Sequence, residues 1–246
     1  MTNVTQQQLR RLAHGIGLRQ IRLFCGLVLF AYLVSHFLNH ALGNISMDAL
    51  AAGVYYHTVF WQFLPVAVLF YTAVFVHMGL GLWALYQRRQ FRWKAIEPLQ
   101  LVLGLSIPAL VIADIVGVLL GQTLFGQETL YPQVFYAYWI VWPYKVWIMF
   151  AVLNVAWIHG CIGIHFWLRM KSFFTKAAPF LLAAAILIPT IAMLGLYQGG
   201  RTVVADSANA EWSAENLTRE QVGSTHEQDV LASIADYSLI GYLGLI

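Results

Sequence analysis

Histidines are the residues of this sequence best placed to do chemistry. There are eight, and five of them, together with Asp114, fall inside long apolar runs of the chain. These five are His36, His40, His77, His159 and His165. An ionisable side chain at membrane depth is costly, so each of these residues is a candidate functional site. His14, His57 and His226 lie outside the runs, and composition alone gives them no special role.

Two of the histidines are predicted to lie at matching depth on separate helices. His77 comes 11 residues before Arg88 and His159 comes 10 residues before Arg169. At a helical rise of 1.5 Å per residue, the two lie about 16 Å and about 15 Å from the same boundary. Two neutral imidazoles so placed are the ligands that a bis-histidine haem requires. Nearby glycines are expected to let the macrocycle approach the backbone: Gly79, Gly81, Gly160 and Gly163.

A second polar layer is predicted farther from that boundary. His36 follows Arg19 by 17 residues, and Asp114 follows Glu97 by the same number, which places both at a depth of about 25 Å. This layer pairs a histidine with a carboxylate. His40, one turn beyond His36, is expected to form hydrogen bonds at the interface rather than to bind a metal.

The residues near the basic boundary have further candidate roles. His165 is either a contact for a haem propionate or a quinone, or a side chain that reaches the interface. Arg19, Arg22 and Arg169 are cationic and lie at the boundary where the propionates of an inner haem would need neutralising. No catalytic residue is predicted.

The elements that position these residues follow from composition. The chain has 246 residues, of which 60% are hydrophobic and 10% charged, with a mean hydropathy of +0.67. Ordinary soluble domains carry about 25% charged residues. This composition excludes a soluble globular enzyme and a disordered chain, and the net charge of +3 is too small to indicate nucleic-acid binding. It predicts an all-α, polytopic membrane protein.

Apolar runs of about 20 residues, the length that crosses a bilayer, predict a bundle of six transmembrane helices. Five runs are complete, and a sixth from about residue 230 reads as truncated. Residues 1–22 form a cytoplasmic N-terminal segment, 23–246 form the six-helix membrane domain, and 199–229 form an external polar segment in which residues 209–221 are predicted to form a short surface helix. The five complete runs are 23–42, 63–86, 99–120, 144–168 and 177–197.

Lysine and arginine mark one face of this bundle. Of the 14 basic residues, 11 precede the first run or lie in the loops after the second and fourth. The positive-inside rule then places the N-terminus in the cytoplasm. The 11 residues are Arg10, Arg11, Arg19, Arg22, Arg88, Arg89, Arg92, Lys94, Arg169, Lys171 and Lys176.

Three histidine motifs together resemble a known family. They read LVSHFLNHALG at 33–43, VHMGLGLWALYQRR at 76–89 and IHGCIGIHFWLR at 158–169. They are similar to the six-helix haem b membrane anchor of bacterial class III adenylate cyclases. That anchor is in turn similar to the dihaem cytochrome b subunit of succinate:quinone oxidoreductase and fumarate reductase. The aromatic segment 130–147, LYPQVFYAYWIVWPYKVW, fits the cyclase anchor better.

The resemblance implies two haem b sites. His77 and His159 would ligate the iron of an inner haem, and His36 that of an outer haem. The outer ligand's usual partner is a histidine on the third helix, where this chain has Asp114. Such a site is empty, five-coordinate through His36, or completed by His40 or His57.

Function and location follow from the same resemblance. It implies a quinone-linked redox sensor in the bacterial inner membrane, which regulates a C-terminal cyclase domain in the parent chain, as a dimer. One alternative is an electron-transfer cytochrome b subunit of a respiratory complex. Another is a haem-free membrane anchor or receptor.

Overall fold

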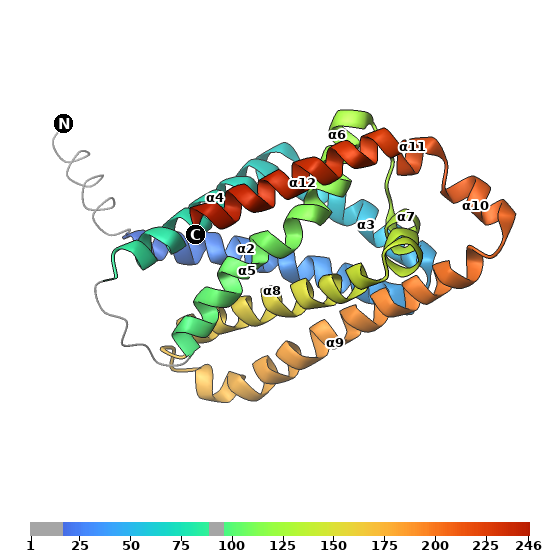
Figure 1. Cartoon of the computed structure of the whole chain (residues 1–246). Helices are drawn as coiled ribbons and strands as arrows, with labels where there is room; N and C mark the ends of the chain where they lie inside the picture. The colour runs from blue at the N-terminus through green and yellow to red at the C-terminus, as the bar shows by residue number, and fades with distance from the viewer. Residues whose placement is uncertain (1–16, 89–95) are drawn as a thin grey trace, which may run out of the picture. The chain divides into compact units, whose positions relative to one another are not determined.

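The computed structural model describes residues 17–88 and 96–246, which form helices and contain no strand (Figure 1). The helices are α2 (Leu18–Ala41), η1 (Leu42–Asn44), α3 (Met47–Trp61), α4 (Leu64–Tyr86), α5 (Ile96–Ile115), η2 (Val116–Leu120), α6 (Gly121–Phe125), α7 (Tyr131–Tyr136), η3 (Ala137–Val141), α8 (Tyr144–Leu168), α9 (Phe174–Asp206), α10 (Ala210–Asn216), α11 (Arg219–Val222) and α12 (Thr225–Leu245). The all-α prediction is confirmed.

Five helical stretches of the described chain are long and apolar enough to cross a membrane. They are Leu18–Asn44, Leu64–Tyr86, Ile96–Phe125, Tyr144–Leu168 and Phe174–Asp206. Large apolar side chains on them face outward, including Phe75 at 66% exposed and Phe180 at 77%. Water does not tolerate so much exposed apolar surface, whereas lipid does. The chain is therefore a helical, multi-pass membrane protein.

The predicted bounds of the fourth apolar run agree with α8, whereas the predicted end of the fifth run lies before the end of α9. The run 144–168 coincides with α8, whereas α9 continues nine residues beyond the predicted end at Tyr197. Gly199 and Gly200 are buried, and a Cβ on either would meet the ring of Phe135 or Trp139. Packing against these two aromatic rings keeps the helix intact through both glycines, although glycine disfavours a helix interior.

The surface helix of the polar segment begins where the sequence predicts and ends earlier. Asn209 is the N-cap of α10, and its side chain accepts a hydrogen bond from the Glu211 amide at 2.9 Å. Asparagine is among the strongest N-cap residues. The helix ends at Asn216, and the short helix α11 follows it separately from Arg219 to Val222.

The chain divides into two compact units, described separately here. The first comprises residues 1–36 and 56–93, and so holds most of α2, the last turns of α3 and all of α4. Aromatic rings pack its helices together: the Tyr32 ring lies 4.5 Å from that of Phe70 and 5.1 Å from that of Trp61, measured between centroids. The Trp61 indole N–H also donates to the Ser35 hydroxyl at 3.0 Å.

The second unit comprises residues 37–55 and 94–246. Within it α8 runs antiparallel to both α5 and α9 (Figure 1, yellow, green and orange). One contact between α8 and α9 lies beside Pro189 of α9. Proline has no N–H, so the Ala185 carbonyl, one turn earlier, lacks its helical donor. The Trp157 indole donates to this carbonyl at 2.8 Å. In an apolar surrounding this bond replaces the one that proline removes.

Helix α12 lies antiparallel against α5 and η2 in the same unit. Its apolar residues Leu231 and Ala235 form a buried cluster with Val116 of η2. Farther along, the Tyr242 hydroxyl donates to the Leu105 carbonyl of α5 at 2.7 Å. The helix starts at a capping box, in which the Ser224 hydroxyl accepts from the Glu227 amide and the Glu227 carboxylate accepts from the Ser224 amide.

Candidate functional site

His77, on α4, is held against α2 by a hydrogen bond to the backbone. Its Nδ1 atom lies 3.1 Å from the carbonyl oxygen of Arg22. A carbonyl oxygen only accepts, so Nδ1 carries the proton and Nε2 carries the lone pair of the ring. The imidazole packs directly over Gly26, where an added Cβ would lie 3.0 Å from Cε1 of His77.

His159, on α8, is held against α5 in the same way. Its Nδ1 atom lies 2.9 Å from the carbonyl oxygen of Gln100. A Cβ on Gly104 would lie 2.6 Å from Cε1 of His159 and 3.0 Å from Nδ1. Both rings therefore bond the carbonyl of one residue and cover a glycine four residues later, which is one helical turn.

This repeated arrangement is of the kind found at metal-ligating histidines. Histidines that ligate metals donate their second ring N–H to a carbonyl or carboxylate, which fixes the tautomer and the ring orientation. Histidine with Nε2 as the lone-pair atom is the form that binds haem iron. Among the described residues no group of three or more His, Cys, Asp or Glu could hold a metal ion. Single imidazoles suit a metal whose other ligands belong to a cofactor, and the donor chemistry here fits haem.

The glycines in contact with the two imidazole rings are not among the four that the sequence singles out. An added Cβ at Gly79 or Gly81 meets no atom within 4 Å, and one at Gly163 meets only Gln100 Nε2, at 3.4 Å. Gly26 and Gly104 lie instead on the neighbouring helices, under the two rings. The sequence shows Gly26 and Gly104 only as glycines within two apolar runs, and such a glycine does not reveal its partner.

His40 belongs to a buried polar cluster of the second unit. It is 6% exposed, and its Nδ1 lies 2.9 Å from the hydroxyl of Tyr131. The Asn39 amide donates to the same hydroxyl at 2.9 Å. The hydrogen-bonding role expected for His40 fits this cluster, which ties the end of α2 to α7.

Asp114 lies near the end of α5 and accepts a hydrogen bond from the Tyr138 hydroxyl at 2.9 Å. The Lys145 ammonium lies 4.0 Å from the centre of the Trp142 ring and 5.7 Å from that of Tyr138. Asp114 lies two residues before the π-helical turns of η2, and Tyr138 lies in those of η3. The carboxylate is thus engaged in a polar cluster of the second unit, between two π-bulges of a kind often found at functional sites.

His36 and His57 lie side by side in the first unit. Their ring centroids are 5.5 Å apart, and each ring contacts Tyr32, at 5.6 Å and 5.2 Å. Sequence reasoning gave His57 little weight because it lies outside the apolar runs. The position of His57 in α3 brings its ring to that of His36, and no local sequence motif predicts this contact.

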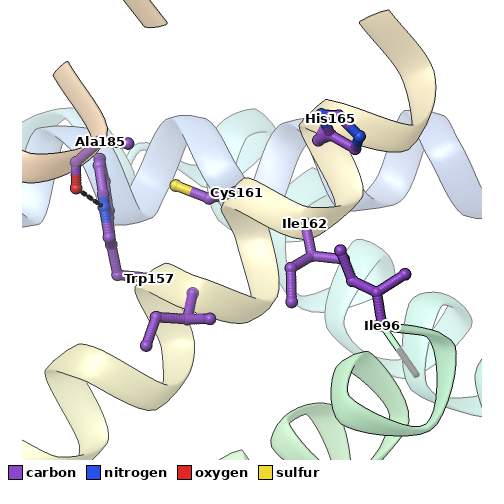
Figure 2. Close-up of a pocket in the computed structure, with 7 residues that line it drawn as sticks. Ile96, Trp157, Cys161, Ile162, His165 and Ala185 are labelled. Carbon is purple, nitrogen blue, oxygen red and sulfur yellow. Dashed lines mark hydrogen bonds between the residues drawn. The ribbon is translucent and has the colours of Figure 1, made fainter. Parts of the chain in front are cut away.

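His165 lies at the edge of an apolar groove in the second unit (Figure 2). The groove has a volume of about 310 Å³, and Trp157, Cys161 and Ile162 from α8 line it with Ile96 and Ala185. The His165 ring is exposed and lies 5.5 Å from that of Phe174. An imidazole beside an apolar groove is suited to a lipid-soluble molecule with a polar ring.

The basic residues near the two histidine sites lie at helix ends. Arg19 is exposed in the first turn of α2, and Arg22 contributes its backbone carbonyl to His77. The Arg169 guanidinium lies 4.8 Å from the centre of the Phe166 ring. Five of the predicted boundary cations lie outside the described residues: Arg10, Arg11, Arg89, Arg92 and Lys94.

No family model, curated protein or solved structure matches this chain.

Proposed function

We propose that this chain is a haem b-binding membrane domain that exchanges electrons with quinol and acts as a redox sensor. One observation carries the proposal: His77 and His159 share an arrangement in which Nδ1 donates to a carbonyl and the ring covers a glycine. Two independent helix contacts that both select the Nε2-ligand tautomer are hard to explain by packing alone. The three histidine motifs of the sequence support the same reading.

His77 and His159 would hold the iron through Nε2. Haem, when bound, supplies one-electron redox chemistry. The chain contributes the fixed orientation of the imidazoles, through the Arg22 and Gln100 carbonyls, and a dry apolar surrounding. Cationic groups at the ends of α2 and α8, from Arg19 and Arg169, are suited to the carboxylates of haem propionates.

We place the N-terminus in the cytoplasm of a bacterial inner membrane, with α12 as the sixth span. The described cations Arg19, Arg22 and Arg88 flank α2 and α4 on one side, and Lys171 lies between α8 and α9, as the positive-inside rule expects. The Tyr242–Leu105 hydrogen bond lies within the length of α5, which supports α12 as a membrane helix.

Quinone is the electron partner that reaches such a site through lipid. We place its contact at the groove beside His165, where an apolar lining and one imidazole meet. The neutral imidazole can donate to or accept from a quinone oxygen. The cavity volume of about 310 Å³ lies at the low end of the range for small-molecule pockets.

A short physical path supports the sensor over a purely electron-transferring subunit. Gly104 lies under the His159 ring, and the carbonyl of the next residue, Leu105, accepts the hydrogen bond from Tyr242 of α12. A redox-dependent movement of the His159 ring would change the geometry of the Tyr242–Leu105 hydrogen bond. The effector implied by the family resemblance is an adenylate cyclase domain coupled to α12. Such signalling needs two states whose energies the redox change shifts differently.

Difference spectra of the purified full chain, reduced minus oxidised, test the proposal. We expect a b-type α band, reduction by a short-chain quinol, and loss of that haem in His77→Ala and His159→Ala. His226→Ala is the matched control, since His226 is exposed at the start of α12. A chain without haem, or variants with unchanged spectra, would overturn the assignment. Tyr242→Phe should keep the haem but weaken the redox-dependent change at α12, measured with a spin label on that helix.

A further inference from the structure

Asp114, Tyr138, Trp142 and Lys145 form a charged cluster of the second unit that the proposed haem and quinone sites do not use. The Asp114 side chain is exposed on α5, and its Oδ1 atom accepts from the Tyr138 hydroxyl at 2.9 Å. Among the described residues, no donor reaches its second oxygen, Oδ2. This oxygen is therefore open to a ligand, and a charge that faces lipid is costly without one.

The Lys145 ammonium is unpaired in the same way. It lies over aromatic rings, 4.0 Å from the centre of Trp142 and 5.7 Å from that of Tyr138, and forms no ion pair with any carboxylate of the described residues. Lys145 is half-buried at the start of α8 and is close enough to Asp114 for their charges to interact. The cluster thus holds an anion and a cation that lie near each other without forming an ion pair.

The cluster lies at the level where a membrane helix meets the lipid headgroups. Asp114 comes 18 residues after Ile96, the first residue of α5. At 1.5 Å per residue this is about 27 Å, close to the hydrocarbon thickness of about 30 Å. Tyr144 and Trp147, on either side of Lys145 in α8, are 59% and 74% exposed, and exposed aromatic side chains are typical of the headgroup level. A phospholipid headgroup is the molecule that this position brings to the cluster.

The two charges identify the kind of headgroup. A headgroup with only a phosphate would suit Lys145 but would be repelled by the Asp114 carboxylate. A headgroup with both a phosphate and a primary ammonium matches both side chains, because the ammonium can donate to Oδ2 of Asp114 and the phosphate can accept from Lys145. A choline headgroup has no N–H to donate, so it would leave Oδ2 without a hydrogen bond.

We propose that Asp114 and Lys145 bind the headgroup of a phosphatidylethanolamine molecule, with the Tyr138 and Trp142 rings as the wall of the site. The proposal does not depend on haem, and it gives the Asp114 carboxylate a ligand in addition to Tyr138. A lipid bound here would connect α5, η3 and the start of α8 to one leaflet of the bilayer.

Lipid retention by the purified full chain tests this proposal. The chain is equilibrated in nanodiscs that contain equal amounts of phosphatidylethanolamine, phosphatidylcholine and phosphatidylglycerol, then transferred to detergent, and its retained lipids are counted by native mass spectrometry. We expect phosphatidylethanolamine to be retained at least about tenfold over phosphatidylcholine, because only its ammonium donates a hydrogen bond to a charged group. Asp114→Asn should abolish this preference, and Lys145→Gln should release the lipid.

Two further variants are controls. Lys145→Arg keeps the cation and should keep the lipid, which distinguishes loss of a charge from misfolding. Lys171→Gln removes an exposed lysine between α8 and α9 and should retain the parent's preference. Equal retention of the three lipids by the parent would overturn the proposal, and so would stronger retention of phosphatidylglycerol, which would indicate a site for any anionic lipid. An unchanged preference in Asp114→Asn would also overturn it, because the carboxylate would then not contact the ammonium.

Discussion

Gly104→Ala is a sharp test of how the second unit prepares His159. The added Cβ would lie 2.6 Å from Cε1 of the imidazole, whereas ordinary contact begins at 3.4 Å. The ring must therefore retreat by about 0.8 Å, the difference between these two distances. The imidazole cannot make this movement and keep its hydrogen bond, because Nδ1 is bound to the carbonyl oxygen of Gln100 on the same helix as the added Cβ.

This displacement weakens the hydrogen bond that fixes the tautomer. The bond from Nδ1 to the Gln100 carbonyl is 2.9 Å long, and a retreat of 0.8 Å away from α5 takes it past the limit of about 3.2 Å for a good bond. Its loss costs about 1 kcal/mol, which the gain of alanine over glycine in a helix, also about 1 kcal/mol, offsets. The stability of the fold should therefore change little. Haem affinity should fall about 10–100-fold, as it does when a metal ligand loses its supporting partner.

The assay is haem titration of the purified apoprotein, with thermal unfolding measured alongside. Gly163→Ala is the matched control, because its Cβ would meet only Gln100 Nε2, at 3.4 Å. That variant lies one turn from His159 on α8 and should keep the parent's affinity. Equal affinities for the parent and Gly104→Ala would refute the reasoning, and so would an equal loss in both variants, which would indicate a general helix-packing effect.

Three further predictions concern other sites. His165→Ala should slow reduction of the haem by quinol at least about tenfold without altering haem content, measured by stopped-flow absorbance; an unchanged rate would remove the quinone from this groove. Asp114→His should raise the pyridine haemochrome value, because it places a nitrogen at the position that the resemblance pairs with His36; an unchanged value would contradict an outer site that the parent leaves empty. Hydrogen bonds from Ser224 lower the pKa of Glu227 below its usual value. The ionised carboxylate therefore stabilises the start of α12 above about pH 4.5. This stabilisation is lost as the pH falls through the lowered pKa of the folded chain. Hydrogen exchange of the first turn of α12 should therefore quicken at acid pH in the parent, and should be fast but less pH-dependent in Glu227→Gln.

Sequence periodicity and composition predicted the helices well and their ends unevenly. The bounds of α8 agree because Pro143 precedes the helix and Arg169 follows it. The end of α9 was wrong because Phe135 and Trp139 lie far away in the sequence, yet their packing decides whether Gly199 and Gly200 remain helical.

The candidate site shows the same division. Residue type and depth select His77 and His159 as candidate ligands, and the structure gives the two the same hydrogen-bonded arrangement. Their supporting groups are not local: the Arg22 carbonyl is 55 residues from His77, and the Gln100 carbonyl is 59 residues from His159. Local sequence patterns do not identify a carbonyl and a glycine on another helix as the partners of a given histidine. They also do not show that His57, in a helix of mixed polarity, lies against His36.

Asp114 is held by a contact that its place in the sequence does not reveal. A carboxylate near a membrane helix end is tolerated only with a donor, and the Tyr138 hydroxyl, 24 residues away, provides one at 2.9 Å. Tyr138 lies in η3 and Asp114 lies two residues before η2, so this hydrogen bond joins the two π-helical segments of the second unit. An account of Asp114 as a lost haem ligand must include this bond, because the carboxylate that replaces the expected histidine also holds these two segments together.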